Sequence, residues 1–303
     1  MPAPITLDTV RAAPSARWQS FDARKSYPLD LSKALWIQLQ LSANAPTVGW
    51  NVKLPKPSID SVELYVPRLE GGWRVQAAGD HIAQTAWPVH GLHPQFVLPD
   101  LAVGTTTVFV KMTSAVPVSF DLQVLSPKQA QSDTLDHFLR SGLVLALMLS
   151  MAFISACLAL IYRDAAYACY SIYALLAIIT ASSYSGWGGY LLWPEATRWP
   201  ERSTDVSLLV CLMAQMVFCY ATFSPQRLHR AFTPVAWSAA ALTTVCTGVV
   251  MASDDVSVRA MTFFLGMLIN WPVITAMVYV RLRQGDLSAK LWILAYVPLW
   301  ATI

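Results

Sequence analysis

Charge is the scarcest feature of this 303-residue sequence. Asp, Glu, Lys and Arg make up 13% of it, about half of the usual share, whereas 55% is hydrophobic. This scarcity excludes an ordinary soluble domain and indicates a membrane protein. The net charge of +3 is too small to indicate a nucleic-acid-binding surface or an acidic partner. We therefore expect no nucleic acid among its partners.

Cysteine and a secretory signal are both absent from the first part of the chain. The five cysteines all lie between Cys157 and Cys246, so the region before them cannot contain a disulfide in any compartment. Residues 1–30 lack a sufficiently long apolar run, because Pro, Arg, Asp and Lys interrupt every candidate. The end at Ile303 also falls inside an apolar run. These features predict a fragment whose export signal has been removed or precedes the assigned start.

Signatures of catalysis and metal binding are missing as well. The sequence has no GGDEF string, no kinase motif, no Gly-rich phosphate-binding loop and no nucleophile beside a base. His90 and His93 in HGLHPQ have a spacing that could serve a metal, but no cysteine and no third ligand accompany them. We expect no catalytic residue, metal or cofactor here, and a catalytically silent chain.

Two regions with different solvents make up the sequence. Up to about Leu135 the residues are mixed and polar, whereas long stretches from Leu139 onward carry no charge. The sequence predicts four parts: a lead-in at 1–30, a β domain at 31–127, a linker at 128–138 and a membrane region at 139–303.

Alternation of apolar and polar residues with a period of two runs through the β domain and predicts strands buried on one face. In LWIQLQL (35–41), Leu and Ile share one face while Gln38 and Gln40 share the other. SVELYV (61–66) and VSFDLQV (118–124) alternate likewise. Further strands are expected at 48–54, 73–76, 96–98 and 106–114, separated by turn residues. Seven or so strands in about 100 residues predict an antiparallel β-sandwich of the jelly-roll kind.

Aromatic and histidine side chains are the candidate ligand contacts in the β domain. Aromatic rings can stack on a sugar, and histidines in a loop can hydrogen-bond its hydroxyls. The candidate residues are Tyr65, Trp73, Trp87, His90 and His93. In the alternative interpretation, the aromatic residues fill the core or cover its edge.

Apolar runs without charge fill the membrane region. At about 1.5 Å per residue, the run 141–162 covers the roughly 30 Å hydrocarbon core of a bilayer. Similar runs follow at 165–190, 206–223, 231–253 and 260–280. A sixth run, 291–303, is too short to cross. The sequence predicts five complete spans and an incomplete sixth.

Basic residues in the short connections predict the orientation. The first, third and fifth connections carry Arg163, then Arg227 and Arg230, then the basic residues of 281–290, whereas the fourth, 254–259, has one arginine beside two aspartates. The odd-numbered connections are therefore expected in the cytoplasm. This places the β domain outside, in the periplasm of a Gram-negative cell.

No charged residue lies deep inside a predicted span, which disfavours an ion pump. Gln215 and Asn270 are the amide side chains well inside the spans, and we expect them to hydrogen-bond between helices.

The order of these parts and several local strings resemble one family, the bacterial seven-transmembrane receptors with diverse intracellular signalling modules that carry the second type of extracellular sensory domain. In the β domain the resemblance rests on LWIQLQL, SVELYVP, GGWRVQAAGD, PQFVLP and TVFVKMTS. In the membrane region it rests on Arg163-Asp164 followed by YACYSIY. The chain departs from the family pattern at Gln38 and Lys111, where arginine is expected in many members.

The resemblance implies a jelly-roll sensory domain that binds carbohydrate or a related small molecule, seven spans with the sixth truncated here, and a bacterial inner membrane. It also implies a cytoplasmic output module beyond Ile303, first a diguanylate cyclase and second a histidine kinase, so that the full-length protein is an enzyme. The expected partners are the ligand, the bilayer and a second copy of the chain.

Two other function classes stay open. One is a transporter or membrane-embedded enzyme with an accessory outer domain, and the other is a structural assembly subunit. The charge-free spans and the lack of inverted repeats or broken helices count against a transporter.

Overall fold

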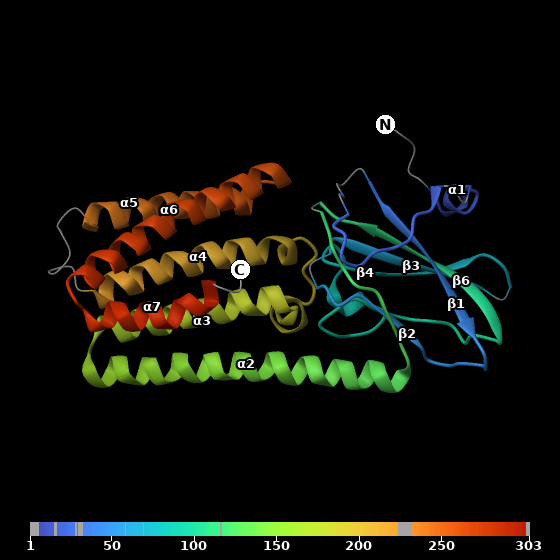
Figure 1. Cartoon of the computed structure of the whole chain (residues 1–303), viewed down its shortest axis with the longest axis horizontal. Helices are drawn as coiled ribbons and strands as arrows, with labels where there is room; N and C mark the ends of the chain where they lie inside the picture. Colours follow the sequence, from blue (N-terminus) through green and yellow to red (C-terminus); the bar gives the residue numbers. More distant parts are fainter. Residues whose placement is uncertain are drawn as a thin grey trace. The chain divides into compact units, whose positions relative to one another are not determined.

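The chain divides into two compact units. The structure, a computed structural model, describes residues 6–14, 17–27, 29, 33–57, 59–68, 70–115, 117–223 and 232–300. The sheet unit comprises Met1–Ser141 and Tyr184–Glu201, and the helical unit comprises Gly142–Ser183 and Arg202–Ile303. Figure 1 shows the strands in the first unit and most of the helical residues in the second.

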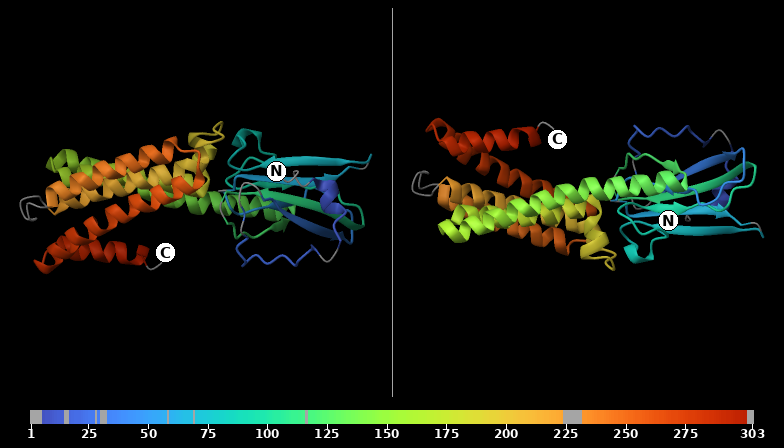
Figure 2. Two further views of the ribbon diagram at one scale, coloured as in Figure 1. Left: turned by 90° about the horizontal axis from the view of Figure 1, so that it is seen from above. Right: turned by 90° about the horizontal axis from the view of Figure 1, so that it is seen from below.

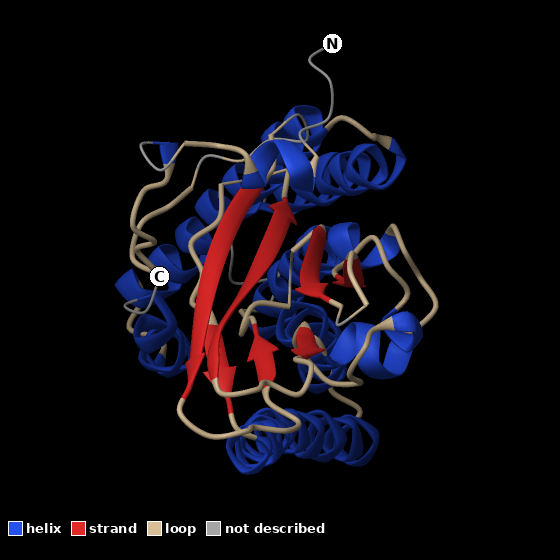
Figure 3. Ribbon diagram, turned by 90° about the vertical axis from the view of Figure 1, so that its right-hand side faces the viewer, coloured by secondary structure: helices blue, strands red, loops and turns tan. Residues whose placement is uncertain are grey.

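Two antiparallel sheets lie in the sheet unit, one with strand order β1-β6-β3-β4 and one with order β5-β2-β7 (Figure 3). The strands are β1 (Leu35–Ala43), β2 (Asn51–Lys53), β3 (Ser61–Pro67), β4 (Trp73–Ala78), β5 (Gln95–Val97), β6 (Gly104–Thr113) and β7 (Gln123–Leu125). The predicted antiparallel β domain is confirmed. A jelly roll has eight strands in two Greek keys, whereas the described residues contain these seven, so the jelly roll stays a prediction.

One hydrophobic core joins the two sheets. The register of the first sheet places Ile37 of β1 and Leu64 of β3 on either side of Val110 in β6. Val52 of β2 and Phe96 of β5 belong to the same core, and both are fully buried. Because alternate residues of a strand face the same side, the apolar faces predicted at 35–41 and 61–66 are confirmed, and the sheets pack as a sandwich.

Two predicted strands are shorter than their apolar patterns. In the segment 48–54 the regular strand is β2, and hydrogen bonds from the Leu98 N–H to Trp50 and from the Leu54 N–H to Pro94 continue its pairing by one residue at each end. Gly49, with a left-handed φ of 71°, breaks the extended chain before it. In 118–124, Val118 and Phe120 are buried, yet Val118 makes only an isolated bridge to Tyr27 and pairing begins at β7. Alternation there reports burial rather than sheet pairing.

Helix α2 (Pro127–Tyr162) begins earlier than the expected membrane span. Ser126 and Gln129 form a reciprocal capping pair, in which Gln129 Oε1 accepts from the Ser126 N–H at 3.0 Å and Ser126 Oγ accepts from the Gln129 N–H at 3.4 Å. Pro127 occupies the first helical position, which suits its fixed φ. Residues 128–138, assigned to a linker from the sequence, are therefore helical.

Five described helices are long and apolar enough to cross a membrane, and they run broadly lengthwise beside one another (Figure 2). They are α2, α3 (Ala165–Ser185), α4 (Trp199–Thr222), α5 (Phe232–Ala252) and α6 (Val256–Arg283). They match the five predicted spans, and apolar helices of this kind imply a lipid bilayer. Helix α7 (Leu287–Trp300) has 14 residues, so the count of seven spans stays a prediction. Arg227 and Arg230 lie outside the described residues.

Polar contacts inside the helical unit join neighbouring helices. Asn270 of α6 is fully buried and donates from Nδ2 to Thr243 Oγ1 of α5 at 2.7 Å. This confirms the interhelical role predicted for Asn270. Gly266, one turn earlier, lies so close to α4 that a Cβ there would be 2.6 Å from Leu209 Cδ2. Ser171 of α3 donates to a carbonyl of α2 at 3.0 Å.

Candidate functional site

The structure separates the five predicted ligand residues into four places. Tyr65 and Trp73 lie on β3 and β4, with their side chains on the face of the first sheet that points away from the core. Trp87 is 7% exposed, belongs to the core, and donates its indole N–H to the Ile82 carbonyl at 3.2 Å. His90 is exposed in the loop after Trp87, and His93 lines a cavity. Only Tyr65 and Trp73 therefore share one surface.

An aromatic cluster covers that outer face. Phe109 lies opposite Tyr65 in the register, and its ring makes an edge contact with Trp73 at 5.6 Å between centroids. The Tyr65 ring lies 5.3 Å from that of Trp36 on β1. The Tyr65 hydroxyl donates to the Glu63 carboxylate, and burial together with this acid raises the pKa of Tyr65. The phenol therefore stays protonated.

A groove of about 470 Å³ lies at this face, between β1 and the lead-in. Trp36, Gln38 and Gln40 line it from β1, and Arg17 and Lys25 line it from the lead-in. The indole N–H of Trp36 is buried and has no hydrogen-bond partner among the described residues. Among the described residues no carboxylate lines the groove, and its amides, rings and cations can bind a ligand rich in oxygen acceptors.

Trp36 is not among the five ligand contacts predicted from the sequence. The available signal was the alternation of LWIQLQL, which places Trp36, Gln38 and Gln40 together on the outward face.

The loop 79–94, which carries Trp87, His90 and His93, packs against the chain between α3 and α4. The Gln84 N–H donates to the Pro194 carbonyl at 2.8 Å. Gly186 has a φ of 86°, and a Cβ there would collide with the Leu92 carbonyl oxygen. His81 Nε2 lies 3.5 Å from the Glu201 carboxylate. This loop therefore holds 184–201 against the sandwich within the sheet unit.

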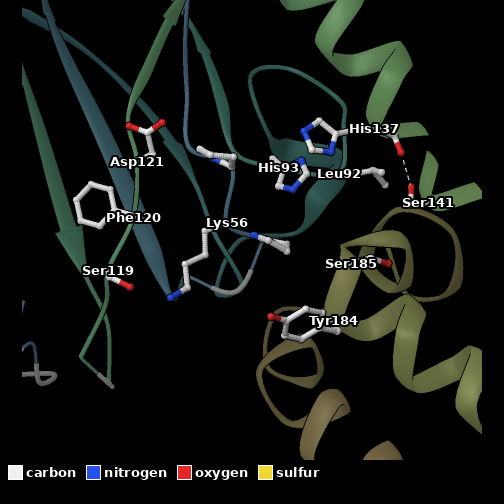
Figure 4. A pocket seen from close by; sticks show the side chains of 12 residues that line it. Lys56, Leu92, His93, Ser119, Phe120, Asp121, His137, Ser141, Tyr184 and Ser185 are labelled. Atoms are coloured by element: carbon white, nitrogen blue, oxygen red, sulfur yellow. Dashed lines mark hydrogen bonds between the residues drawn. The ribbon is translucent and has the colours of Figure 1, made fainter. Parts of the chain in front are cut away.

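A second cavity, of about 530 Å³, lies where the sandwich meets the first turns of α2 and the end of α3 (Figure 4). Every residue that lines it belongs to the sheet unit. His93 and His137 stack edge to face with centroids 4.9 Å apart. Burial, followed by the charges of Lys53 and His137 and opposed by that of Asp133, lowers the pKa of His93 to about 4. His93 is therefore neutral at physiological pH.

An ion pair lies beside the two histidines. Lys53 of β2, with a side chain 3% exposed, donates to the Asp133 carboxylate of α2. His137 Nε2 is 3.7 Å from the other Asp133 oxygen. These contacts join the sandwich to the helix that continues into the helical unit.

Asp80 of the loop 79–94 lies near two other acidic residues, Asp60 and Glu201. Burial, the neighbouring Asp60 and then Glu201 raise the pKa of Asp80 to about 8. Within the described ranges, no group of three or more His, Cys, Asp or Glu side chains is placed to hold a metal ion. The polar side chains that line the two cavities can offer hydrogen bonds and charge to a ligand.

Both regions of the chain match known protein families. Residues 137–303, more than half of the chain, match the family described as 7TM diverse intracellular signalling. Residues 2–126 match the family described as 7TMR-DISM extracellular 2, and the first turns of α2, residues 127–136, lie between the two matches. No curated protein matches the chain significantly. The chain therefore belongs to the seven-transmembrane receptors with diverse intracellular signalling, as a multi-pass transmembrane sensory receptor with an extracellular domain of the second type.

Proposed function

We propose that this receptor senses a small molecule, with a carbohydrate as the first choice, in the groove between β1 and the lead-in. We propose further that α2 carries the response into the membrane. The observation that carries the proposal is the continuity of α2. Its residues up to Ser141 belong to the sheet unit and those from Gly142 to the helical unit, within one unbroken helix. A change in how the first turns pack can therefore pass along the helix to the span.

The Lys53–Asp133 pair and the His93–His137 contact support this route, because both join the sandwich to the first turns of α2. A ligand can shift such a receptor only if it binds one of two arrangements more tightly than the other. We propose that the two arrangements differ in these contacts.

The composition of the groove supports a carbohydrate as the ligand class. Sugars present apolar faces to aromatic rings and hydroxyls to amides. The groove offers the Trp36 ring and the amides of Gln38 and Gln40 on one strand.

For the output, we propose a diguanylate cyclase, with a histidine kinase as second choice, on the cytoplasmic side of a bacterial inner membrane. The support is the description of the matched family, which names intracellular signalling. We also propose that two copies of the chain associate through α2, which exposes large apolar side chains such as Leu147 and Phe153.

Sugar binding to the detergent-solubilised chain tests the ligand site. A panel of monosaccharides and disaccharides is screened by calorimetry, and the best binder is titrated into Trp36→Ala and Gln38→Ala. Loss of stacking or of an amide hydrogen bond should weaken binding about tenfold. Gln131→Ala is the matched control, because Gln131 is exposed on α2 and outside the groove. Unchanged binding by Trp36→Ala would show that the site lies elsewhere.

The output is tested in cells that express the natural gene. Cyclic di-GMP should change when the same sugar is added, and Trp36→Ala should abolish the change. A response that persists in Trp36→Ala would separate the signal from this groove.

A further inference from the structure

A lysine that makes no ion pair with the described residues lines the cavity between the sandwich, α2 and α3. Lys56, just after β2, is partly buried and lines the cavity (Figure 4). Among the described residues, its ammonium group has neither an ion-pair nor a hydrogen-bond partner. Burial lowers the pKa of Lys56, which is the expected effect of removing water from a cation that nothing compensates. An anion in the cavity would compensate it.

Among the described residues that line the cavity, Asp121 is the one with a carboxylate, and its hydrogen bonds are to its own segment. Asp121 accepts hydrogen bonds from the Leu122 N–H at 2.9 Å and from Gln123 Nε2 at 3.2 Å. It is also exposed to water. Asp121 therefore leaves Lys56 available to a ligand.

The other groups at the cavity define the rest of the ligand. Neutral His93 and the hydroxyl groups of Ser119 and Tyr184 can donate or accept hydrogen bonds. Phe120 and Leu92 contribute apolar surface, and the volume of about 530 Å³ is that of a small-molecule site. One cation, a few hydrogen-bonding groups and an apolar wall suit an organic acid with a compact hydrocarbon body.

We propose that this cavity is a second ligand site, which binds a small monocarboxylate with an apolar body through the ammonium group of Lys56. This cavity shares no described lining residue with the groove beside β1. The proposal of an acid site can therefore be tested independently of the proposed sugar site. The walls of the cavity come from the sandwich, from His137 and Ser141 of α2 and from the end of α3. A bound acid therefore holds these three segments together.

Benzoate and its neutral counterpart benzamide are suitable probes, because they have nearly the same shape and differ in charge. Calorimetry on the detergent-solubilised chain should show benzoate binding at least about tenfold more tightly than benzamide. Lys56→Gln should weaken benzoate binding at least about tenfold and remove the preference over benzamide. Lys56→Arg should retain most of the binding, and so should Lys128→Gln, whose exposed lysine lies outside the cavity.

A second readout follows the three walls of the cavity. Benzoate should slow amide hydrogen exchange in residues 133–141 and 184–186 of the wild type and leave exchange in Lys56→Gln unchanged. Equal binding of benzoate and benzamide, benzoate binding by Lys56→Gln equal to that of the wild type, or no benzoate binding at ~10 mM would overturn the proposal.

Discussion

The ion pair between β2 and α2 should respond unequally to removal of its two partners. The Lys53 side chain is 3% exposed, whereas that of Asp133 is 32% exposed. Asp133→Asn leaves a buried ammonium without its counter-charge, which costs on the order of 3 kcal/mol. Lys53→Met leaves a carboxylate that water can reach, so its cost should be on the order of 1 kcal/mol. Asp133→Asn should therefore release the first turns of α2 more readily.

Hydrogen exchange of residues 127–141, measured by mass spectrometry on the full chain in nanodiscs, reports this opening. A loss of about 3 kcal/mol should accelerate exchange on the order of a hundredfold. Asp136→Asn is the matched control, because Asp136 is 59% exposed and pairs with an arginine that is 84% exposed. Its exchange should stay within about threefold of wild type. Equal exchange in Asp133→Asn and Asp136→Asn, or faster exchange in Lys53→Met than in Asp133→Asn, would refute the reasoning.

Three further predictions concern other parts of the structure. Gly186→Ala should lower the free energy of unfolding by on the order of 2 kcal/mol, because the φ of Gly186 is 86° and the new Cβ would collide with a carbonyl oxygen. Gly285→Ala is the control: its φ is 75° but the new Cβ would meet no atom, so the free energy of unfolding should fall by about 1 kcal/mol. The pKa of His93 is about 4 in the folded chain and about 6.5 in the unfolded chain, so the unfolded chain binds a proton first as the pH falls. The free energy of unfolding should therefore be highest above about pH 6.5 and should fall by at most about 3 kcal/mol as the pH drops towards 4. His93→Gln should flatten this pH dependence of the unfolding midpoint. Asn270→Ala and Thr243→Val should each lower the free energy of unfolding by about 1 kcal/mol. The double variant should lower it by less than the sum of the two, because each single variant already removes the same hydrogen bond.

Local patterns in the sequence predicted the strands and helices whose burial follows directly from the periodicity of their own residues. The period-two alternation located β1 and β3 and their inner faces, because a sandwich buries alternate residues of each strand. Long apolar runs located the spans for the same reason, since lipid contacts every side of a helix. The capping pair at Ser126 and Gln129 was equally local, and it could have placed the start of α2 before the assigned linker.

The sites depend on residues far apart in the chain, and no local pattern predicts them. Trp87, His90 and His93 were predicted as ligand contacts, whereas their loop, 79–94, packs against residues 184–201, which lie about a hundred positions later in the chain. Trp87 looks like a stacking surface in sequence, and only the fold shows that its ring fills the core. The cavity around Lys56 brings together residues near positions 55, 93, 120, 137 and 184.

The side of the membrane on which each unit's exposed residues lie is the most direct test of the receptor account. Single cysteines are placed at Asn44, exposed after β1, and at Ser288, exposed at the start of α7, with the five native cysteines replaced by alanine. Spheroplasts are treated with a membrane-impermeant maleimide before and after permeabilisation. Asn44→Cys should react in intact spheroplasts, and Ser288→Cys should react only after permeabilisation. Reaction of both before permeabilisation, or the reverse pattern, would contradict an outer sensory domain joined through the membrane to a cytoplasmic output.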